Sequence, residues 1–283
     1  MKHIEADKSF LDTGLGLGLS CIENYLLYIY ANLNIDYRYL FSKSYVGFSE
    51  IAKAFCENKV SYSNFNRIPR LQDTSAQSGI LNISENSDFQ AINTDDSYIC
   101  IGVSRQFIQQ QYNRDMWRDD HFVLLCNKTG DVYKILNDNP QDIFVLTGNQ
   151  LENAYNGTVL NIQIIQYEVP YDFKLKYKEE FVDSLGNSAD RYLFKAPDLE
   201  TARDLVGVLR VTRKRIREYC SLYCDTNFMS DYISQIEKVY FMIEYMRIRG
   251  RVDHEKVCHS LSALHDIDIN IIGEINGKMR VYK

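Results

Sequence analysis

The sequence predicts an α+β fold, in which strands and helices occupy separate stretches of the chain. Three observations support this prediction: a capped helix signal near residue 21, β-rich runs separated by turn residues between 98 and 169, and amphipathic helical patterns from residue 198 onward. Strands and helices that segregate in this way pack as α+β layers rather than as alternating βαβ units. With 283 residues, 45% of them apolar, the chain is long enough to bury a substantial core.

The first helix is predicted to begin at Cys21. Ser20 is a typical N-cap, and Glu23 stands three residues later, where it completes a capping box. Apolar residues then recur at three- and four-residue steps and predict a buried stripe, formed by Ile22, Leu26, Ile29 and Leu33. A second, shorter helix is expected over residues 48–57, whereas the polar stretch 61–96 predicts mostly loop with short elements.

Antiparallel strands are predicted in the middle of the chain. Residues 98–103, 121–126 and 132–136 are rich in β-branched or aromatic side chains. The segment 128–131 (Lys-Thr-Gly-Asp) predicts a hairpin turn between the last two of these strands. A further β-rich run, 159–169, stops at a proline.

The last third of the sequence is predicted to be mainly helical. Helices are expected over 198–224, 230–249 and 253–264, followed by two short β-like pieces at 268–272 and 278–282. We therefore expect a catalytic domain over residues 1–190 and a mainly helical part, 191–283, packed on it.

Composition excludes several classes of function. The net charge of −6 argues against a nucleic-acid-binding protein, which normally presents a basic face. No apolar run reaches the roughly 18 to 20 residues that a membrane-spanning helix needs. The first residues mix charged and apolar side chains, unlike a signal peptide, so we expect a cytoplasmic protein without membrane contact. Seven cysteines, an odd number, favour free thiols in a reducing compartment.

Cys21 is the candidate nucleophile. As the first residue of a helix it would face unpaired backbone N–H groups and the positive end of the helix dipole, which favour a thiolate. The same N–H groups are possible donors to the oxyanion that forms when a thiol attacks a carbonyl. Glycine occupies every second position from Gly14 to Gly18, where a substrate can approach the backbone closely.

His121 is the candidate general base. Of the five histidines, it alone stands at the head of a predicted strand, directly after the polar residues 118–120. The next strand ends in Asn137, Asp138, Asn139 and Pro140. Because adjacent antiparallel strands bring this end beside His121, one of these amide or carboxylate side chains can hold the imidazole in one tautomer.

A helix-leading Cys, a downstream His that opens a strand and an Asn or Asp that closes the next strand resemble the papain-like fold. Within that group, the segment 97–140 is similar to the N-terminal domain of the butirosin biosynthesis protein H family, with a strand at 98–103, a polar, aromatic-rich excursion at 107–117 and then the His strand. The resemblance covers residues 20–140 and not the C-terminal helices. It implies a catalytic triad of Cys21, His121 and Asp138, in which Asn137 or Asn139 is an alternative to Asp138.

The chain departs from the papain pattern at the oxyanion hole. Papain-type enzymes place a glutamine six residues before the nucleophile, where this chain has Leu15, whose side chain donates no hydrogen bond. A backbone N–H is an alternative donor, and the sequence leaves this donor unidentified.

The resemblance implies an acyltransferase of secondary-metabolite biosynthesis, making products such as antibiotics or siderophores. The acyl group would come from an acyl carrier protein or another thioester and would pass through a Cys21 acyl-enzyme to a small amine or polyamine. The phosphopantetheine arm of the carrier would be part of the substrate, and no resident cofactor is expected. Peptidase, amidase or thioester hydrolase activity is the alternative, and a catalytically inactive papain-like binding module is a third reading, favoured if Cys21 lies far from His121.

Other reactive residue types have plainer interpretations. Cys56, Cys100 and Cys126 lie in apolar runs and are expected to be buried hydrophobic residues. Cys220 and Cys224 with Cys258 and His259 resemble a zinc site only loosely, and we expect no metal. The basic segment 210–217 is expected to be a solvated helix face, with docking of an acidic carrier protein as the alternative. Asp119 and Asp120 are either loop surface or contacts for a cationic acceptor.

Overall fold

The computed structural model describes residues 1–7, 16–93, 96–114, 121–186 and 191–281. It contains one antiparallel sheet together with helices, so the α+β prediction is confirmed. Contacts within the chain define two units: unit 1 comprises Met1–Tyr37 and Arg70–Pro170, and unit 2 comprises Arg38–Pro69 and Tyr171–Lys283. This grouping differs from the expected division at residue 190, because the segment 38–69 belongs with the C-terminal helices.

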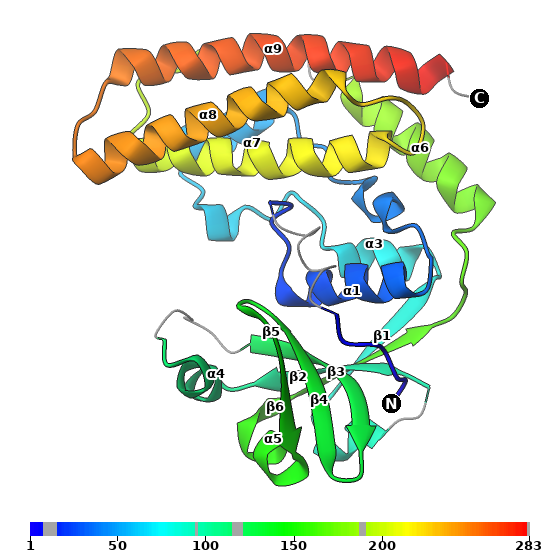
Figure 1. The fold of residues 1–283 in the computed structure, drawn as a ribbon. Helices are drawn as coiled ribbons and strands as arrows, with labels where there is room; N and C mark the ends of the chain where they lie inside the picture. Colours follow the sequence, from blue (N-terminus) through cyan, green and yellow to red (C-terminus); the bar gives the residue numbers. More distant parts are fainter. Residues whose placement is uncertain (8–15, 94–95, 115–120, 187–190, 282–283) are drawn as a thin grey trace. The chain divides into compact units, whose positions relative to one another are not determined.

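Unit 1 is built on a six-stranded antiparallel sheet (Figure 1). In spatial order the strands are β1 (Leu81–Asn86), β6 (Tyr155–Ile164), β2 (Tyr98–Val103), β3 (His121–Thr129), β4 (Val132–Asp138) and β5 (Gln141–Thr147). Its helices are α1 (Cys21–Asn32), α3 (Leu71–Gln77), α4 (Arg105–Tyr112) and α5 (Gly148–Ala154), with a 3₁₀ turn at Phe89–Asn93. The strands predicted over 98–103, 121–126 and 132–136 are therefore present.

Strand β2 runs through the middle of the core of unit 1. All six of its residues are buried, because β6 and β3 flank it and both of its faces are covered. Alternate side chains on one face, such as Ile99 and Ile101, join a core cluster with Ile108 of α4 and Leu151 of α5. Helix α1 packs against β3, β4 and α3.

Helix α1 starts at the predicted residue but is buried more completely than the predicted stripe. Every side chain from Tyr25 to Tyr30 is buried, whereas Leu33 at the end of the expected stripe is only partly covered. An α-helix that is apolar on all sides belongs inside a protein rather than on its surface. The helix that carries Cys21 is thus a buried element of unit 1.

Several elements of unit 1 differ from the expectations. The stretch 61–96, expected to be mostly loop, contains α3 and the edge strand β1. The run expected over 159–169 begins earlier and ends earlier, at Tyr155–Ile164. The hairpin turn at 128–131 is present, with Gly130 in the left-handed region at φ 59°.

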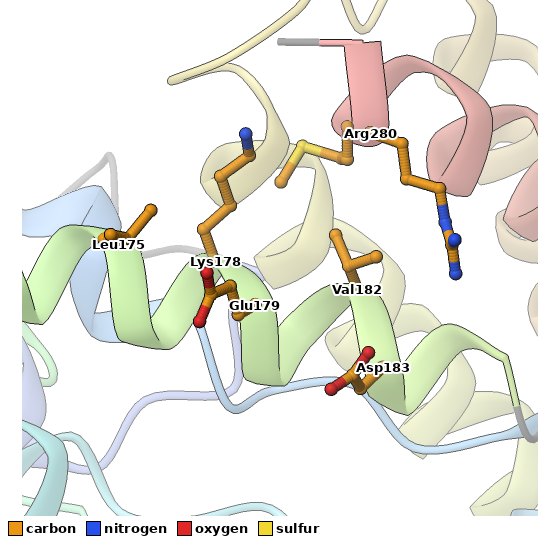
Figure 2. A pocket seen from close by; sticks show the side chains of 7 residues that line it. Leu175, Lys178, Glu179, Val182, Asp183 and Arg280 are labelled. Carbon is orange, nitrogen blue, oxygen red and sulfur yellow. The ribbon is translucent and has the colours of Figure 1, made fainter. Parts of the chain in front are cut away.

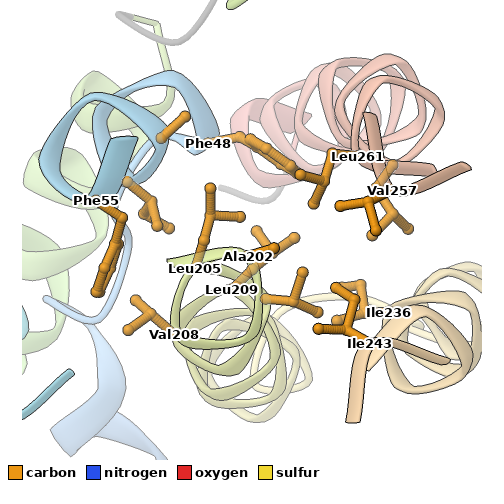
Figure 3. Close-up of a cluster of buried hydrophobic side chains, with 14 of the residues drawn as sticks. Phe48, Phe55, Ala202, Leu205, Val208, Leu209, Ile236, Ile243, Val257 and Leu261 are labelled. Carbon is orange, nitrogen blue, oxygen red and sulfur yellow. The ribbon is translucent and has the colours of Figure 1, made fainter. Parts of the chain in front are cut away.

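Unit 2 is helical in its described residues. It contains α2 (Phe48–Ala52), a π-helical turn at Lys53–Glu57, α6 (Tyr171–Leu185), α7 (Leu199–Cys220), α8 (Phe228–Arg249) and α9 (His254–Val281). It also contains a 3₁₀ turn at Tyr62–Asn64 and all but the first residue of the 3₁₀ turn at Tyr37–Phe41. Helix α7 packs on α8 and α2, and α8 packs on α9. Figure 3 shows apolar side chains from these helices converging, among them Phe48, Leu205, Ile236 and Leu261.

The two β-like pieces expected at 268–272 and 278–282 are wrong where the structure describes them. Residues 254–281 form the single helix α9. Its buried residues follow helical spacing, as Leu261, Leu264, Ile272, Ile275 and Met279 show. Asp268 occupies a buried position on this face and interrupts the apolar pattern.

Asp268 is buried because it pairs with Arg213 of α7. The Arg213 Nε lies 2.6 Å from Asp268 Oδ1, and its second terminal nitrogen lies 2.7 Å from Oδ2. The Tyr232 hydroxyl donates to the same Oδ1 at 2.7 Å. Arg215 is also buried and Lys214 pairs with Glu237 at 2.6 Å, so the basic segment 210–217 is not the solvated face that we expected.

None of the helices in the described ranges combines the length and the apolar character that crossing a membrane requires.

Candidate active site

The position of Cys21 is fixed by the capping box that begins α1. The Ser20 hydroxyl accepts a hydrogen bond from the Glu23 N–H (3.3 Å), and the Glu23 carboxylate accepts one from the Ser20 N–H (2.9 Å). The other Glu23 carboxylate oxygen accepts the N–H of Leu71, the first residue of α3, at 2.9 Å. One buried carboxylate therefore satisfies N–H groups at the start of two helices and holds Cys21 in place.

The Cys21 sulfur lies against strand β3. Three backbone N–H groups act on this sulfur and lower the pKa of the thiol: that of Phe122, the residue next to His121, and those of Ile22 and Cys21 at the helix start. Burial and, second, the negative charge of Asp138 raise the pKa of Cys21 to about 11, although the three N–H groups act in the opposite direction. The N–H groups at the helix start favour the thiolate, as expected, but desolvation outweighs them, and the net pKa of Cys21 is raised.

His121 is held by the end of β4. Its Nε2 lies 2.8 Å from Asn137 Oδ1 and 3.2 Å from Asp138 Oδ1. The Asn137 amide is oriented by its own Nδ2, which donates to the Pro140 carbonyl at 2.7 Å. Both neighbours of Nε2 are thus acceptors, which requires the proton to sit on Nε2 and leaves Nδ1 as the basic nitrogen.

Asp138 is held in turn by α1. Its Oδ2 accepts a hydrogen bond from Asn24 Nδ2 at 2.8 Å, and its main-chain N–H donates to the Tyr25 hydroxyl at 3.2 Å. We did not anticipate Asn24 or Tyr25 from the sequence. The signal was their spacing, because residues three and four positions after Cys21 lie on the same face of a helix.

The structure brings His121 together with Asn137 and Asp138, and the charge of Asp138 acts on the Cys21 thiol; all four residues belong to unit 1. Asn139 is exposed in the turn that follows β4. Gly14, Leu15, Asp119 and Asp120 lie outside the described residues, so the structure does not bear on the expectations for them. Gly16 and Gly18 adopt φ values of 86° and 63°, a region that favours glycine, in the segment before the nucleophile.

The remaining cysteines take other positions. Cys100 and Cys126 are buried as expected, whereas Cys56 is only half-buried. Cys220 is buried, and the Cys224 thiol contacts the Cys220 carbonyl at 3.6 Å. Within the described residues, no group of three or more His, Cys, Asp or Glu side chains is arranged to hold a metal ion.

A groove of about 390 Å³ lies in unit 2 between α6 and the end of α9 (Figure 2). Lys178 and Glu179 of α6 line it together with Arg280 of α9, so its charges are mixed. A hollow of about 320 Å³ in unit 1 lies beside Met1, His3 and Lys128. Neither hollow is lined by Cys21, His121, Asn137 or Asp138.

Neither a scan against protein-family models nor a search of curated proteins finds a match for this chain. The geometry of Cys21, His121, Asn137 and Asp138 is therefore what indicates the chemistry of this site. A thiol at a helix N-terminus, a histidine with a defined free nitrogen and a carboxylate that orients it are the parts of a nucleophilic acyl-transfer site.

Proposed function

We propose that this chain is a papain-like cysteine acyltransferase that transfers an acyl group from a thioester to an amine through a Cys21 acyl-enzyme. The observation that carries the proposal is the position of Asp138, which lies 3.2 Å from His121 Nε2 and whose negative charge also acts on the Cys21 thiol. The third reading, an inactive binding module, depends on a large separation between Cys21 and His121, and the proximity of Asp138 to both residues argues against such a separation.

In the first half-reaction Cys21 is the nucleophile and His121 the base. Nδ1 of His121 takes the thiol proton while the sulfur forms a bond to the thioester carbonyl carbon. The tetrahedral intermediate collapses with cleavage of the original C–S bond, and the leaving thiolate takes the proton back from the imidazolium. The negative charge of Asp138, 3.2 Å from Nε2, stabilises the imidazolium between these steps.

In the second half-reaction an amine replaces the donor thiol. The amine nitrogen attacks the acyl-Cys21 carbonyl, Nδ1 of His121 takes a proton from that nitrogen, and the Cys21 sulfur leaves and recovers the proton. The products are an amide and the free thiol, so no oxidant or reductant is consumed. The backbone N–H groups of Cys21 and Ile22, at the start of α1, are the proposed donors to the oxyanion.

A thioester donor suits a thiol whose pKa is raised. Burial keeps Cys21 neutral at pH 7, so attack depends on proton removal by His121. Transfer of an acyl group from a thioester donor to the Cys21 thiol replaces one thioester by another of nearly equal free energy. It also avoids attack on an amide, which is a less reactive acyl donor. We therefore propose an acyl carrier protein or another acyl thioester as donor and a small amine or polyamine as acceptor.

Intact mass measured after incubation with short acyl thioesters tests the proposal. The wild type should gain one acyl group, Cys21→Ala should gain none, and Cys258→Ala, a matched change at another partly exposed cysteine, should behave as the wild type. His121→Ala should acylate about 10²–10⁴-fold more slowly. An unchanged adduct in Cys21→Ala would overturn the nucleophile assignment.

The fate of the adduct separates transfer from hydrolysis. Added spermidine should accelerate loss of the acyl group from Cys21 and should itself become acylated. Loss of the acyl group as free acid, at one rate with or without amine, would instead assign the chain to the thioester hydrolases or amidases.

A further inference from the structure

Strands β3 and β4 stop pairing just before the candidate active site. The last pair in their register is Leu124 with Leu136. Because the strands are antiparallel, continuing this register by two residues places Phe122 opposite Asp138. Phe122 follows His121 in the sequence, and Asp138 contacts the His121 side chain. The way in which the two strand ends separate therefore determines the geometry of the site.

The Tyr25 hydroxyl lies between the two strands where their pairing stops. It donates a hydrogen bond to the Phe122 carbonyl at 3.0 Å and accepts one from the Asp138 N–H at 3.2 Å. In a regular antiparallel ladder the strands join such groups to each other directly. One phenol oxygen from α1 therefore bridges the two main chains in place of a strand-to-strand hydrogen bond.

The separation of the strands has two consequences for the site. The Phe122 N–H lies beyond the paired register of β3 and β4 and acts instead on the Cys21 sulfur, where it lowers the pKa of the thiol. The Asp138 carboxylate can reach both His121 Nε2, at 3.2 Å, and Asn24, at 2.8 Å. A direct pairing of Phe122 with Asp138 would remove the first of these interactions and move the second.

The phenol is suited to a permanent bridge. Tyr25 is fully buried, and burial followed by the charge of Asp138 raises the pKa of Tyr25 well above its usual value. The hydroxyl therefore keeps its proton, and with it the ability to donate and accept at once, throughout the pH range in which a cysteine enzyme works.

We propose that Tyr25 is a positioning residue whose hydroxyl holds the ends of β3 and β4 apart so that Cys21, His121 and Asp138 can meet. Its effect on turnover rests on the proposed acyl-transfer function. Its effect on the Cys21 sulfur does not, because that effect follows from the Phe122 N–H alone.

The test compares Tyr25→Phe with Tyr30→Phe. Tyr30 is the matched control, since it is equally buried in α1 and its hydroxyl bonds to Ser75 of α3, away from the site. We expect the maximal rate of acylation by a short thioester to fall about 10- to 100-fold in Tyr25→Phe. The thioester concentration that gives half of the maximal rate should stay within about two-fold of the wild-type value. Tyr30→Phe should keep the wild-type rate within about two-fold, although it also loses a buried hydrogen bond.

Alkylation of Cys21 by iodoacetamide provides a readout that needs no enzymatic activity. Loss of the Phe122 N–H from the sulfur should raise the pKa of Cys21 further in Tyr25→Phe, so its alkylation should become slower at every pH below about 11. Equal acylation and equal alkylation in the two variants would overturn the positioning role. If Cys21→Ala leaves acylation intact but Tyr25→Phe still slows alkylation, the proposed function fails and the positioning role stands.

A measurement on the wild type covers the case in which Tyr25→Phe does not fold. The Asp138 amide proton, held by the phenol oxygen, should exchange with solvent within about ten-fold of the rate of Leu136 in the paired part of β4. Exchange as fast as that of the exposed Asn139 would overturn the proposal.

Discussion

Asn24 Nδ2 donates a hydrogen bond of 2.8 Å to Asp138 Oδ2, although 114 positions of sequence separate the two residues. Asn24 lies one helical turn after Cys21. The helix that presents the candidate nucleophile therefore also orients the carboxylate that contacts His121. A displacement of α1 would move both groups together, which keeps their relative geometry constant.

Asn24→Ala should weaken catalysis without unfolding the protein. Asp138 would lose one donor but keep its contact with His121, so we expect acylation to slow about 10-fold, within the range that misplacement of a catalytic group costs. The measurement is single-turnover acylation followed by mass. Asn32→Ala is the control, because Asn32 lies at the other end of the same helix and its amide donates to the Tyr28 carbonyl rather than to a residue of the candidate site. Equal rates in the two variants would contradict the role of Asn24.

Asp138→Asn should slow acylation about 10²-fold or more. Asn137 is the nearer partner of His121 Nε2, but only Asp138 carries the charge that stabilises an imidazolium. Asn137→Asp keeps an acceptor at that position and should remain within about ten-fold of the wild type. Asn139→Ala, in the exposed turn, should have the wild-type rate. A larger loss in Asn137→Asp than in Asp138→Asn would reverse this assignment.

The reactivity of Cys21 should rise with pH well beyond neutrality. Its pKa is raised to about 11, by burial first and by Asp138 second, and only the thiolate is alkylated. Peptide-resolved iodoacetamide labelling should therefore accelerate up to about pH 11. Removing the negative charge in Asp138→Asn removes a contribution that raises the pKa, so half-maximal labelling should move to lower pH. A half-maximal rate near pH 7 in the wild type would contradict the buried, neutral thiol.

The candidate site could be predicted in part because its main signals are local in sequence. The Ser20–Glu23 capping box marks the residue at which α1 begins, and His121 marks the start of β3. The partners of His121 follow from hairpin geometry, since β4 runs back beside β3. The roles of Asn24 and Tyr25 depend on which face of α1 meets β4, which local sequence does not specify. The pKa of Cys21 depends on burial, which also arises only in the folded chain.

Prediction of the fold succeeded where the apolar pattern was complete. It failed in α9, where a buried polar residue interrupts the pattern. Asp268 falls in the apolar face of α9, so the residues around it resembled an alternating strand. Gly273 and Gly277 lie between the two expected β-like pieces, and in the structure both are residues of the continuous helix α9. Strand β1 escaped prediction for a different reason: it lies at the edge of the sheet, and most of its side chains are exposed or half-buried.

Asp268→Asn should destabilise the protein by about 3–5 kcal/mol, because it leaves the guanidinium of Arg213 buried without its counter-charge. The pair is almost completely buried, with side-chain exposures of 0% for Arg213 and 2% for Asp268. Urea unfolding followed by circular dichroism at 222 nm, which reports on the helices of unit 2, measures the loss. Glu274→Gln is the control, since it breaks the exposed pair with Lys278 on the same helix and should cost less than about 0.5 kcal/mol. Similar losses in the two variants would mean that Asp268 is in α9 for a reason other than neutralising Arg213.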